Sequence, residues 1–421
     1  MTAEKKRKKT NKRAVVAMSG GVDSSVSAAL LKKQGYDVIG VHMKFWHERR
    51  SSSVGKSGKG FNRCCTPDSE KIARLAAKKI NIPFYVFNLE KEFKKRVVDY
   101  FLKEQKAGRT PNPCVVCNKE IKFGLLLERA LKLGADFVAT GHYARLRNTK
   151  KYEYTKIKNK KNSYIRKKAT LRGIRFAYSV FRSLLQAKDK NKDQSYFLWQ
   201  LSQEQLRHIL FPLGGYTKTE VRKMAKKLKL PAAKAPESQE VCFVRTSTND
   251  FLKKYLKPKP GGVASREGKV LGEHQGLCFY TIGQRKGIGL PGGPYYVLSK
   301  DPKKNILIIS KNEKDLLQKE LIVEDVHWIA GYKPKFPLRA SVKIRYRAKP
   351  ADAMIFKFKI SNLKLLFDRG QKAVTPGQSA VFYSPLTNFE FKNDGEKTGL
   401  ESNSKLVGGK GEELLGGGII K

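Results

Sequence analysis

Several features that would assign this chain to a membrane, a secretory route or a disulfide scaffold are absent from its sequence. No stretch approaches the roughly 20 apolar residues of a membrane span. The first residues, MTAEKKRKKTNKR, are basic but lack the apolar core of a secretory signal. Six cysteines in 421 residues are too few for a disulfide scaffold. We therefore expect a cytoplasmic protein with no membrane partner, in which thiols stay reduced.

Acidic residues are also scarce. Asp and Glu number 37 against 87 Lys and Arg, which gives a net charge of +50. Such an excess favours polyanionic partners, nucleic acid above all, although a lysine-rich composition without such a partner would look the same. The hydrophobic fraction of 40% argues against wholesale disorder, and the length suits two or three domains.

The first third of the chain alternates between apolar runs and helical patterns. The runs are continuous rather than alternating, as in strands covered on both faces of a parallel sheet. The predicted strands are 14–18, 37–43, 83–87 and 136–140. The predicted helices are about 24–35, a second one opening at Thr66 and Pro67, and about 119–133. This alternation predicts a doubly wound α/β domain.

Two later regions differ in texture. Residues 147–182 contain thirteen Lys or Arg, one acid and six aromatics, which fits either a solvated hairpin or an extra contact to an RNA backbone. After about Asn249, Gly- and Pro-rich turns separate segments such as 339–347 that alternate at period two. The C-terminal part is therefore expected to be a small antiparallel barrel or sandwich, followed by a loose, Gly-rich tail.

A Gly-Gly turn follows the first predicted strand and opens the first helix, in the segment Ser19-Gly-Gly-Val-Asp-Ser24. Glycine lets the backbone turn tightly near a phosphate, and the helix start offers free N–H groups. Asp23 could hold Mg²⁺ or fix the loop. A plain strand-to-helix turn is the alternative, but the placement favours phosphate binding. The segment resembles the loop of the ATP pyrophosphatase (PP-loop) superfamily. Its members adenylate a substrate and release pyrophosphate.

Two thiols lie in the stiff, proline-flanked segment Arg109-Thr-Pro-Asn-Pro-Cys114-Val-Val-Cys117-Asn118. Lys119 and a predicted helix start follow, where a thiolate would be stabilised. A third thiol, Cys242, lies far along the chain. Two thiols that meet in space can pass sulfur, because one carries a persulfide and the other attacks it to form a disulfide.

Other chemistry for these cysteines stays open. A Cys-x-x-Cys pair is also half of a zinc site, but the adjacent Cys64 and Cys65 would complete it poorly. An iron–sulfur cluster on Cys114, Cys117 and Cys242 is a further alternative. Cys64, Cys65 and Cys278 are interpreted as non-catalytic.

Several long segments together resemble the tRNA-specific 2-thiouridylases over roughly residues 13–385. The matching segments are AMSGGVDSSVSAALL, GVHMKFW, NRCC, GRTPNPCVVCNKEIKFG, ATGHYARL, NKDQSYFLWQL, SQEVCFV, TIGQRKGIGL, VKIRYR and TPGQSAVFY. The resemblance implies a PP-loop domain, a small central domain and a C-terminal β-barrel. It also implies thiolation of the wobble uridine of certain tRNAs, with ATP and Mg²⁺.

The resemblance also assigns roles to individual residues. It implies ATP binding by Ala17, Met18, Ser19, Gly20, Gly21, Val22, Asp23, Ser24, Met43 and Gly141. Cys117 would be the nucleophile and Cys242 the persulfide carrier. The target base would meet Asn112, Pro113 and Cys114, and tRNA would contact His142, Lys192, Asp193, Gln194, Arg345, Tyr346 and Gln378. Some members have Asp where Cys114 stands, so the proton acceptor at this position is open.

The predicted division of the chain combines the patterns with the resemblance. It comprises a basic tail at 1–12, a PP-loop domain at 13–248 with the insertion 147–182, a central domain at 249–318, a β-barrel at 319–396 and a Gly-rich tail at 397–421. The expected partners are tRNA and a sulfur-donating protein, either a cysteine desulfurase or a sulfur relay protein. The rival functions are a PP-loop ligase acting on a small molecule and a catalytically dead RNA-binding protein.

Overall fold

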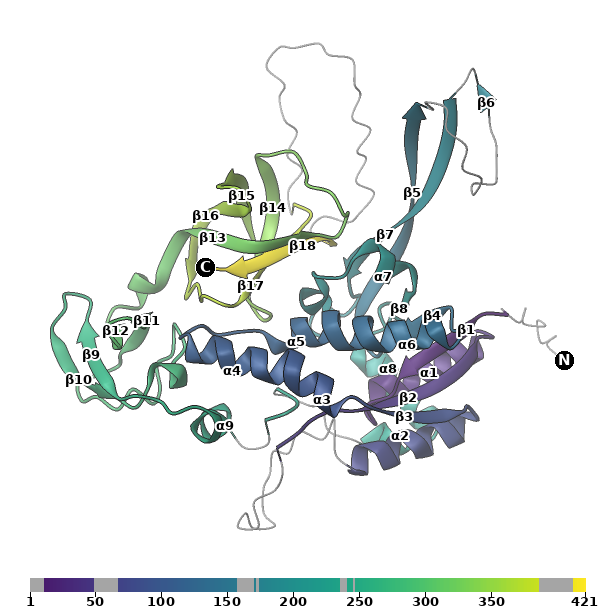
Figure 1. The fold of residues 1–421 in the computed structure, drawn as a ribbon, viewed down its shortest axis with the longest axis horizontal. Coiled ribbons are helices and arrows are strands. Elements are labelled where there is room, and N and C mark those ends of the chain that lie inside the picture. Colours follow the sequence, from purple (N-terminus) through teal and green to yellow (C-terminus); the bar gives the residue numbers. More distant parts are fainter. Residues whose placement is uncertain are drawn as a thin grey trace.

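The computed structural model describes residues 11–48, 67–156, 170–171, 174–234, 241–244, 247–385 and 412–421 (Figure 1). The predicted helix cap at Thr66 and the pair Cys64 and Cys65 lie outside the described residues. Among the helices within these ranges, none is long and apolar enough to cross a membrane.

The first domain has a five-stranded, all-parallel sheet in the order β3-β2-β1-β4-β8. Its strands are β1 Arg13–Ala17, β2 Asp37–Lys44, β3 Phe84–Asn88, β4 Phe137–Ala139 and β8 Ile209–Leu210. Its helices are α1 Val22–Lys33, α2 Pro67–Ile80, α3 Glu90–Phe93, α4 Asp99–Lys106, α5 Pro113–Val116, α6 Leu126–Lys132, α7 Gln203–Arg207 and α8 Lys218–Lys227. The four predicted strands and the doubly wound α/β fold are confirmed.

Glycines end two helices as the sequence predicts, but one predicted start is wrong. Gly35 and Gly134 follow α1 and α6 with φ of 90° and 75°, a conformation that favours glycine. The third predicted helix starts at Pro113 rather than near Lys119. Pro113 provides a first helical residue with a preset φ, and α5 continues through the π-helical segment Cys117–Leu125 into α6. Both cysteines of the pair therefore lie on a helix and not in a loop.

The central domain packs directly on the first. It contains α9 Thr248–Tyr255 and a four-stranded sheet in the order β10-β9-β12-β11, with β9 Gly261–Ser265, β10 Val270–His274, β11 Tyr296–Asp301 and β12 Ile306–Ser310. One apolar core runs across the boundary, where the ring of Phe243 lies 5.9 Å from that of Phe93 and 5.6 Å from that of Phe251. This shared core fixes the two domains against each other.

Six antiparallel strands form the C-terminal barrel. They are β13 Leu317–Trp328, β14 Leu338–Lys343, β15 Ala351–Phe358, β16 Asn362–Lys372, β17 Ser379–Tyr383 and β18 Glu413–Ile420. Their order is β13-β16-β15-β14-β17-β18, and pairing between β13 and β18 closes the barrel. The predicted strand 339–347 ends at Lys343, so Arg345 and Tyr346 belong to a turn.

The prediction of a loose tail at 397–421 is wrong for its last part, because residues 413–420 form β18. The glycine run suggested flexibility, yet it allows close packing between strands. A Cβ atom on Gly416 would lie 2.2 Å from the carbonyl oxygen of His327, and one on Gly418 would lie 2.3 Å from the Val323 side chain. Glycine is required here because neighbouring strands leave no room for a side chain.

The described part of the basic insertion forms a hairpin, as expected of a solvated insertion, while a contact of this hairpin with an RNA backbone stays a prediction. Strand β5, Ala144–Lys156, pairs with β7, Ile174–Gln186, and the two extend as a ribbon away from the parallel sheet, with the short β6, Thr170–Leu171, at its far end (Figure 1). At its base, β7 also pairs with β18 of the barrel. The ribbon base therefore joins the first domain to the barrel.

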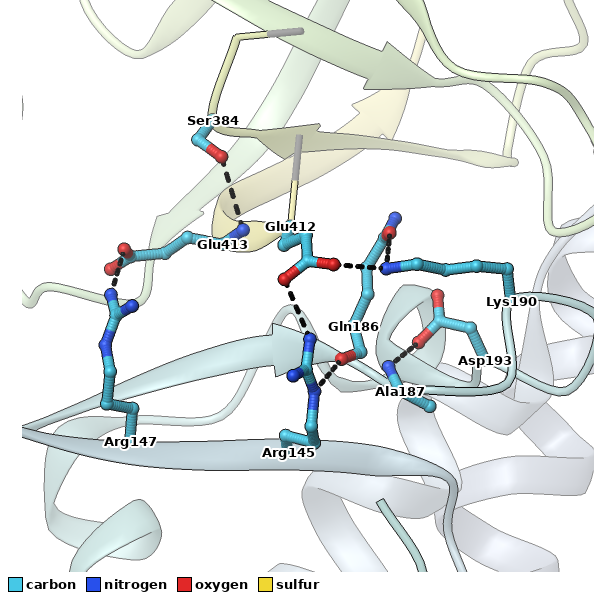
Figure 2. Close-up of polar contacts among 9 residues, drawn as sticks. All are labelled: Arg145, Arg147, Gln186, Ala187, Lys190, Asp193, Ser384, Glu412 and Glu413. Carbon is cyan, nitrogen blue, oxygen red and sulfur yellow. Dashed lines mark hydrogen bonds and ion pairs between the residues drawn. The ribbon is translucent and has the colours of Figure 1, made fainter. Parts of the chain in front are cut away.

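Two carboxylates at the start of β18 strengthen this junction (Figure 2). Glu412 accepts hydrogen bonds from Arg145 at 2.8 Å and from Lys190 at 2.9 Å. Glu413 accepts from Arg147 at 2.8 Å and from the Ser183 hydroxyl at 2.7 Å. Because Glu413 is buried, its charge-assisted bonds are screened less than those of an exposed pair.

Candidate active site

The loop of residues 19–24 connects β1 to α1 and is braced by its own hydroxyls. The backbone N–H of Ser19 donates to Ser24 Oγ at 3.2 Å, and Ser24 Oγ donates to the carbonyl of Gly21 at 3.1 Å. Gly20 has φ of 79°, and a Cβ atom there would lie 2.3 Å from the carbonyl oxygen of Ser69 in α2. Gly21, the N-cap of α1, supplies no side-chain cap. The first N–H groups of the helix can thus serve an anion.

The other residues assigned to ATP gather around this loop. Gly141 follows β4, and a Cβ atom there would lie 2.9 Å from both Asp23 Cβ and the Ser24 nitrogen. Met43 is buried near the end of β2, which pairs with β1. The set lies at the carboxyl ends of neighbouring parallel strands, where open α/β sheets bind ligands.

Asp23 has two partners that the sequence did not single out. Lys218 Nζ lies 2.7 Å and 2.8 Å from the two oxygens of Asp23. The Tyr143 hydroxyl donates to the same carboxylate at 2.9 Å. The sequence pattern of a capping box, Thr217 followed by Glu220, could have predicted that Lys218 is the first residue of α8.

The side chains near this loop could bind a metal ion only together with the phosphates of a bound nucleotide. Within the described residues, no three His, Cys, Asp or Glu side chains gather as metal ligands. Mg²⁺ is commonly bound by one or two carboxylates together with substrate phosphates. Asp23 fits that pattern as the residue that would hold Mg²⁺, provided that the Lys218 ammonium, which contacts both of its oxygens here, moves to the phosphates.

Cys114 and Cys117 lie nearly one helical turn apart but in different environments. Cys114 is exposed at the helix start, whereas Cys117 is buried. Burial raises the pKa of the Cys117 thiol to about 12, while the nearby Lys122 opposes the rise. The expectation of a lowered thiol pKa is wrong for Cys117 in this conformation, because removal from water outweighs the nearby cation.

Cys242 lies close enough to Cys117 to affect it electrostatically. Negative charge on Cys242 or Cys114 would raise the pKa of Cys117 further. Cys242 is half-buried and packs against the same apolar core as Cys117. The structure therefore gathers the three predicted cysteines, but they do not form a metal-binding group in the described part of the chain. In this conformation the three thiols therefore do not fit the ligand set of an iron–sulfur cluster.

The segment before the cysteines docks on the C-terminal barrel. The Thr110 N–H donates to the carbonyl of Pro376 at 2.9 Å, and Gln378 Nε2 donates to the carbonyl of Thr110 at 2.8 Å. Gly377 has φ of 90°, and a Cβ atom there would lie 3.0 Å from Arg109 Cβ. A turn more than 260 residues away therefore fixes the entry to the cysteine helix.

Several residues predicted to contact tRNA have intramolecular partners. His142 Nδ1 lies 2.7 Å from the Thr140 hydroxyl, and burial lowers the pKa of His142 well below its usual value, so the ring is neutral. Asp193 is buried and accepts from the Ala187 N–H at 2.9 Å and from Ser195. Gln194 accepts from the Tyr143 N–H at 3.0 Å. These residues shape the turn beside the phosphate loop, and their contact with tRNA stays a prediction.

Two barrel residues that were predicted to contact tRNA, Arg345 and Tyr346, lie near the cysteine helix. Arg345 donates to the carbonyl of Lys372 at 2.5 Å. The Tyr346 ring lies 4.5 Å from that of Phe197, and Asn118, next to Cys117, donates to the Phe197 carbonyl at 3.0 Å. The sequence predicted that Arg345 and Tyr346 contact tRNA but not that Tyr346 packs on Phe197. Their contact with tRNA stays a prediction.

Three family profiles match consecutive parts of the chain. They are the tRNA methyl transferase HUP domain at residues 12–246, the tRNA methyl transferase PRC-barrel domain at 249–311 and the aminomethyltransferase beta-barrel domain at 318–387. The chain is 43% identical over 377 residues to the tRNA-specific 2-thiouridylase MnmA of Clostridioides difficile strain 630, covering 89% of this chain and 95% of the relative.

Two further relatives carry the same activity in their names. A tRNA-specific 2-thiouridylase MnmA 2 of Thermoanaerobacter sp. strain X514 is 44% identical over 381 residues, covering 89% of this chain and 95% of the relative. The tRNA-specific 2-thiouridylase MnmA of Clostridium perfringens strain ATCC 13124 is 40% identical over 381 residues, covering 89% and 96%. The similarity thus extends over all three domains.

Proposed function

The chain belongs to the tRNA-specific 2-thiouridylase family, and on that premise we propose that it uses ATP to replace the 2-oxygen of the wobble uridine of tRNA with sulfur. The observation that carries this proposal is the proximity of Cys242 and Cys117 within a domain that also contains the phosphate loop. A ligase acting on a small molecule would need neither cysteine.

The first step is adenylation of the base. The uridine 2-oxygen attacks the α-phosphorus of ATP, and the bond to the β-phosphate breaks, so that pyrophosphate leaves. The loop N–H groups at the start of α1 and the hydroxyl of Ser19 are placed to bind phosphate oxygens. Asp23 would hold Mg²⁺, which supplies charge neutralisation on the phosphates when bound. Burial lowers the pKa of His142 well below its usual value, so the ring is neutral before ATP binds.

The second step replaces the activated oxygen. The terminal sulfur of a Cys242 persulfide attacks C2 of the base, and AMP leaves with the former 2-oxygen. The Cys117 thiolate then attacks Cys242 Sγ, a Cys117–Cys242 disulfide forms, and the sulfur remains on the base as 2-thiouridine. A dithiol reductant must return the disulfide to two thiols before the next turnover.

Partners follow from this chemistry. The persulfide must come from a sulfur-donating protein, a cysteine desulfurase or a sulfur relay protein. Thiols that cycle between reduced and oxidised forms suit the cytoplasm. The net charge of +50 supports binding of the tRNA backbone, and the basic ribbon of β5 and β7 extends the surface available for it.

The proposal is tested with purified protein, ATP, tRNA and a persulfide donor, by measuring 2-thiouridine in digested tRNA. Cys242→Ser and Cys117→Ser should each lower its formation on the order of a thousand-fold or more, because each removes a sulfur that forms a bond. Both variants should still bind ATP and tRNA. Cys278→Ser is the matched control, since this half-buried cysteine lies in the central domain. Full thiolation by Cys242→Ser would disprove the proposal.

A further inference from the structure

Lys218 lies against the phosphate loop, although it comes from a helix almost 200 residues further along the chain. Its backbone N–H donates to Asp189 at 2.9 Å, and the adjacent capping box of Thr217 and Glu220 fixes the start of α8. The ammonium contacts both oxygens of Asp23, and the side chain is only 11% exposed. The backbone and the head group of this long side chain are therefore both fixed.

We propose that Lys218 is the cation that binds the departing pyrophosphate of ATP, and that Asp23 holds its ammonium at the loop. The inference rests on the proposed adenylation and deepens it. The loop itself offers N–H groups and hydroxyls, which are neutral donors. A leaving pyrophosphate gains negative charge, and lysine is well suited to phosphate as a compact point charge.

A merely structural salt bridge explains this arrangement less well. Helices α1 and α8 already pack through Val22, Val26, Val221 and Ala225, all of them buried. A largely buried ion pair adds little net stability, because both partners lose water. The pair is moreover aligned by Tyr143, whose hydroxyl donates to Asp23 and whose ring centroid lies 5.7 Å from the ammonium. Such alignment fits a cation that must occupy one defined position.

The proposal assigns opposite effects to the two members of the pair. Pyrophosphate and the Asp23 carboxylate compete for the same ammonium, so Lys218 attracts pyrophosphate and Asp23 repels it. If the pair served only to brace the loop, loss of either member would disturb the loop in the same way. Binding of inorganic pyrophosphate can therefore separate the two roles.

The experiment is calorimetric titration of the full chain with inorganic pyrophosphate, and separately with AMP, in buffer containing EDTA. Lys218→Gln should weaken pyrophosphate binding about tenfold or more and change AMP binding less than about twofold, because AMP lacks the departing phosphates. Lys218→Arg should retain much of the affinity. Asp23→Asn should not weaken pyrophosphate binding in EDTA, because without Mg²⁺ the change removes only the carboxylate that competes for the ammonium; the role of Asp23 in turnover is a separate one.

Lys188→Gln is the matched control, because Lys188 pairs with Glu220 at the same helix entrance and the charge change is identical. It should leave pyrophosphate binding unchanged. Unaltered affinity in Lys218→Gln, or equal weakening in Lys218→Gln and Asp23→Asn, would show that the pair is only structural. If the unaltered protein binds AMP but not pyrophosphate, this inference fails while the proposed adenylation stands. If it binds neither ligand when Mg²⁺ replaces EDTA, the proposed ATP chemistry fails as well.

Discussion

The phosphate loop and the cysteine segment belong to one domain, yet different parts of the molecule position them. Residues 19–24 are braced by hydroxyls of the same loop and by neighbouring elements of the same sheet domain. The cysteine segment instead enters its helix through Thr110, which is bonded to Pro376 and Gln378 of the barrel. Nucleotide binding is therefore a property of the first domain, whereas presentation of the cysteines needs the last one.

The two sites also differ in whether their functional groups are in a reactive state. The start of α1 offers N–H groups that no side chain caps, so the loop is organised for an anion. Cys117 is buried and its pKa is raised to about 12, so its thiol is protonated at neutral pH. If tRNA contacts Arg345, Tyr346 and Gln378 of the barrel and Cys114 of the cysteine helix, as predicted, its binding would change that environment. In this conformation the loop is therefore organised for an anion, whereas sulfur transfer requires that Cys117 lose its proton.

Among the substitutions that separate the two sites, the largest effect is expected from those that disrupt only the nucleotide site. Asp23→Ala and Ser24→Ala should lower tRNA-dependent pyrophosphate release by about 100-fold to 1,000-fold, because the loop loses its brace and its charge partner. Pyrophosphate release is measured with a coupled assay. The tRNA affinity of both variants should be unchanged, since the cysteine segment is positioned elsewhere. Normal pyrophosphate release would separate this loop from the reaction.

A second prediction concerns pH and the thiol. A raised pKa means that Cys117 is protonated below that pKa, and the thiolate fraction grows about tenfold for each pH unit. Between pH 7 and 9, single-turnover thiolation should therefore rise by up to about 100-fold. Pyrophosphate release from the same reactions should change much less. Equal thiolation rates across this range would show that bound tRNA already lowers the pKa of Cys117.

The smallest expected effect tests the link between the barrel and the cysteine segment. Gln378→Ala removes the hydrogen bond to the Thr110 carbonyl and should slow thiolation at saturating tRNA about fivefold, with ATP affinity retained. Gln371→Ala is the control, because its side chain donates a hydrogen bond within its own strand, to the carbonyl of Arg369. A loss confined to tRNA affinity would mean that Gln378 acts as a tRNA contact instead.

The sequence predicted local features well where a short pattern has one physical solution. Continuous apolar runs gave the parallel strands β1 to β4, and Gly35 and Gly134 marked helix ends. The order of strand, Gly-Gly turn and helix located the phosphate loop, because an anion-binding helix start needs no distant partner. The roles of Cys117 and Cys242 were implied by the resemblance of the segments around them to the 2-thiouridylases, and the structure places the two residues against the same core.

Tertiary structure alone decided the features that depend on distant segments. The glycine run in 413–420 reads as flexible in isolation, but β13, β17 and the Trp199 ring leave no space for side chains there. The raised pKa of Cys117 comes from burial by residues scattered along the chain, and the contact of Lys218 with Asp23 joins residues 195 positions apart. Such effects follow from packing and desolvation in the folded chain, which no local pattern encodes.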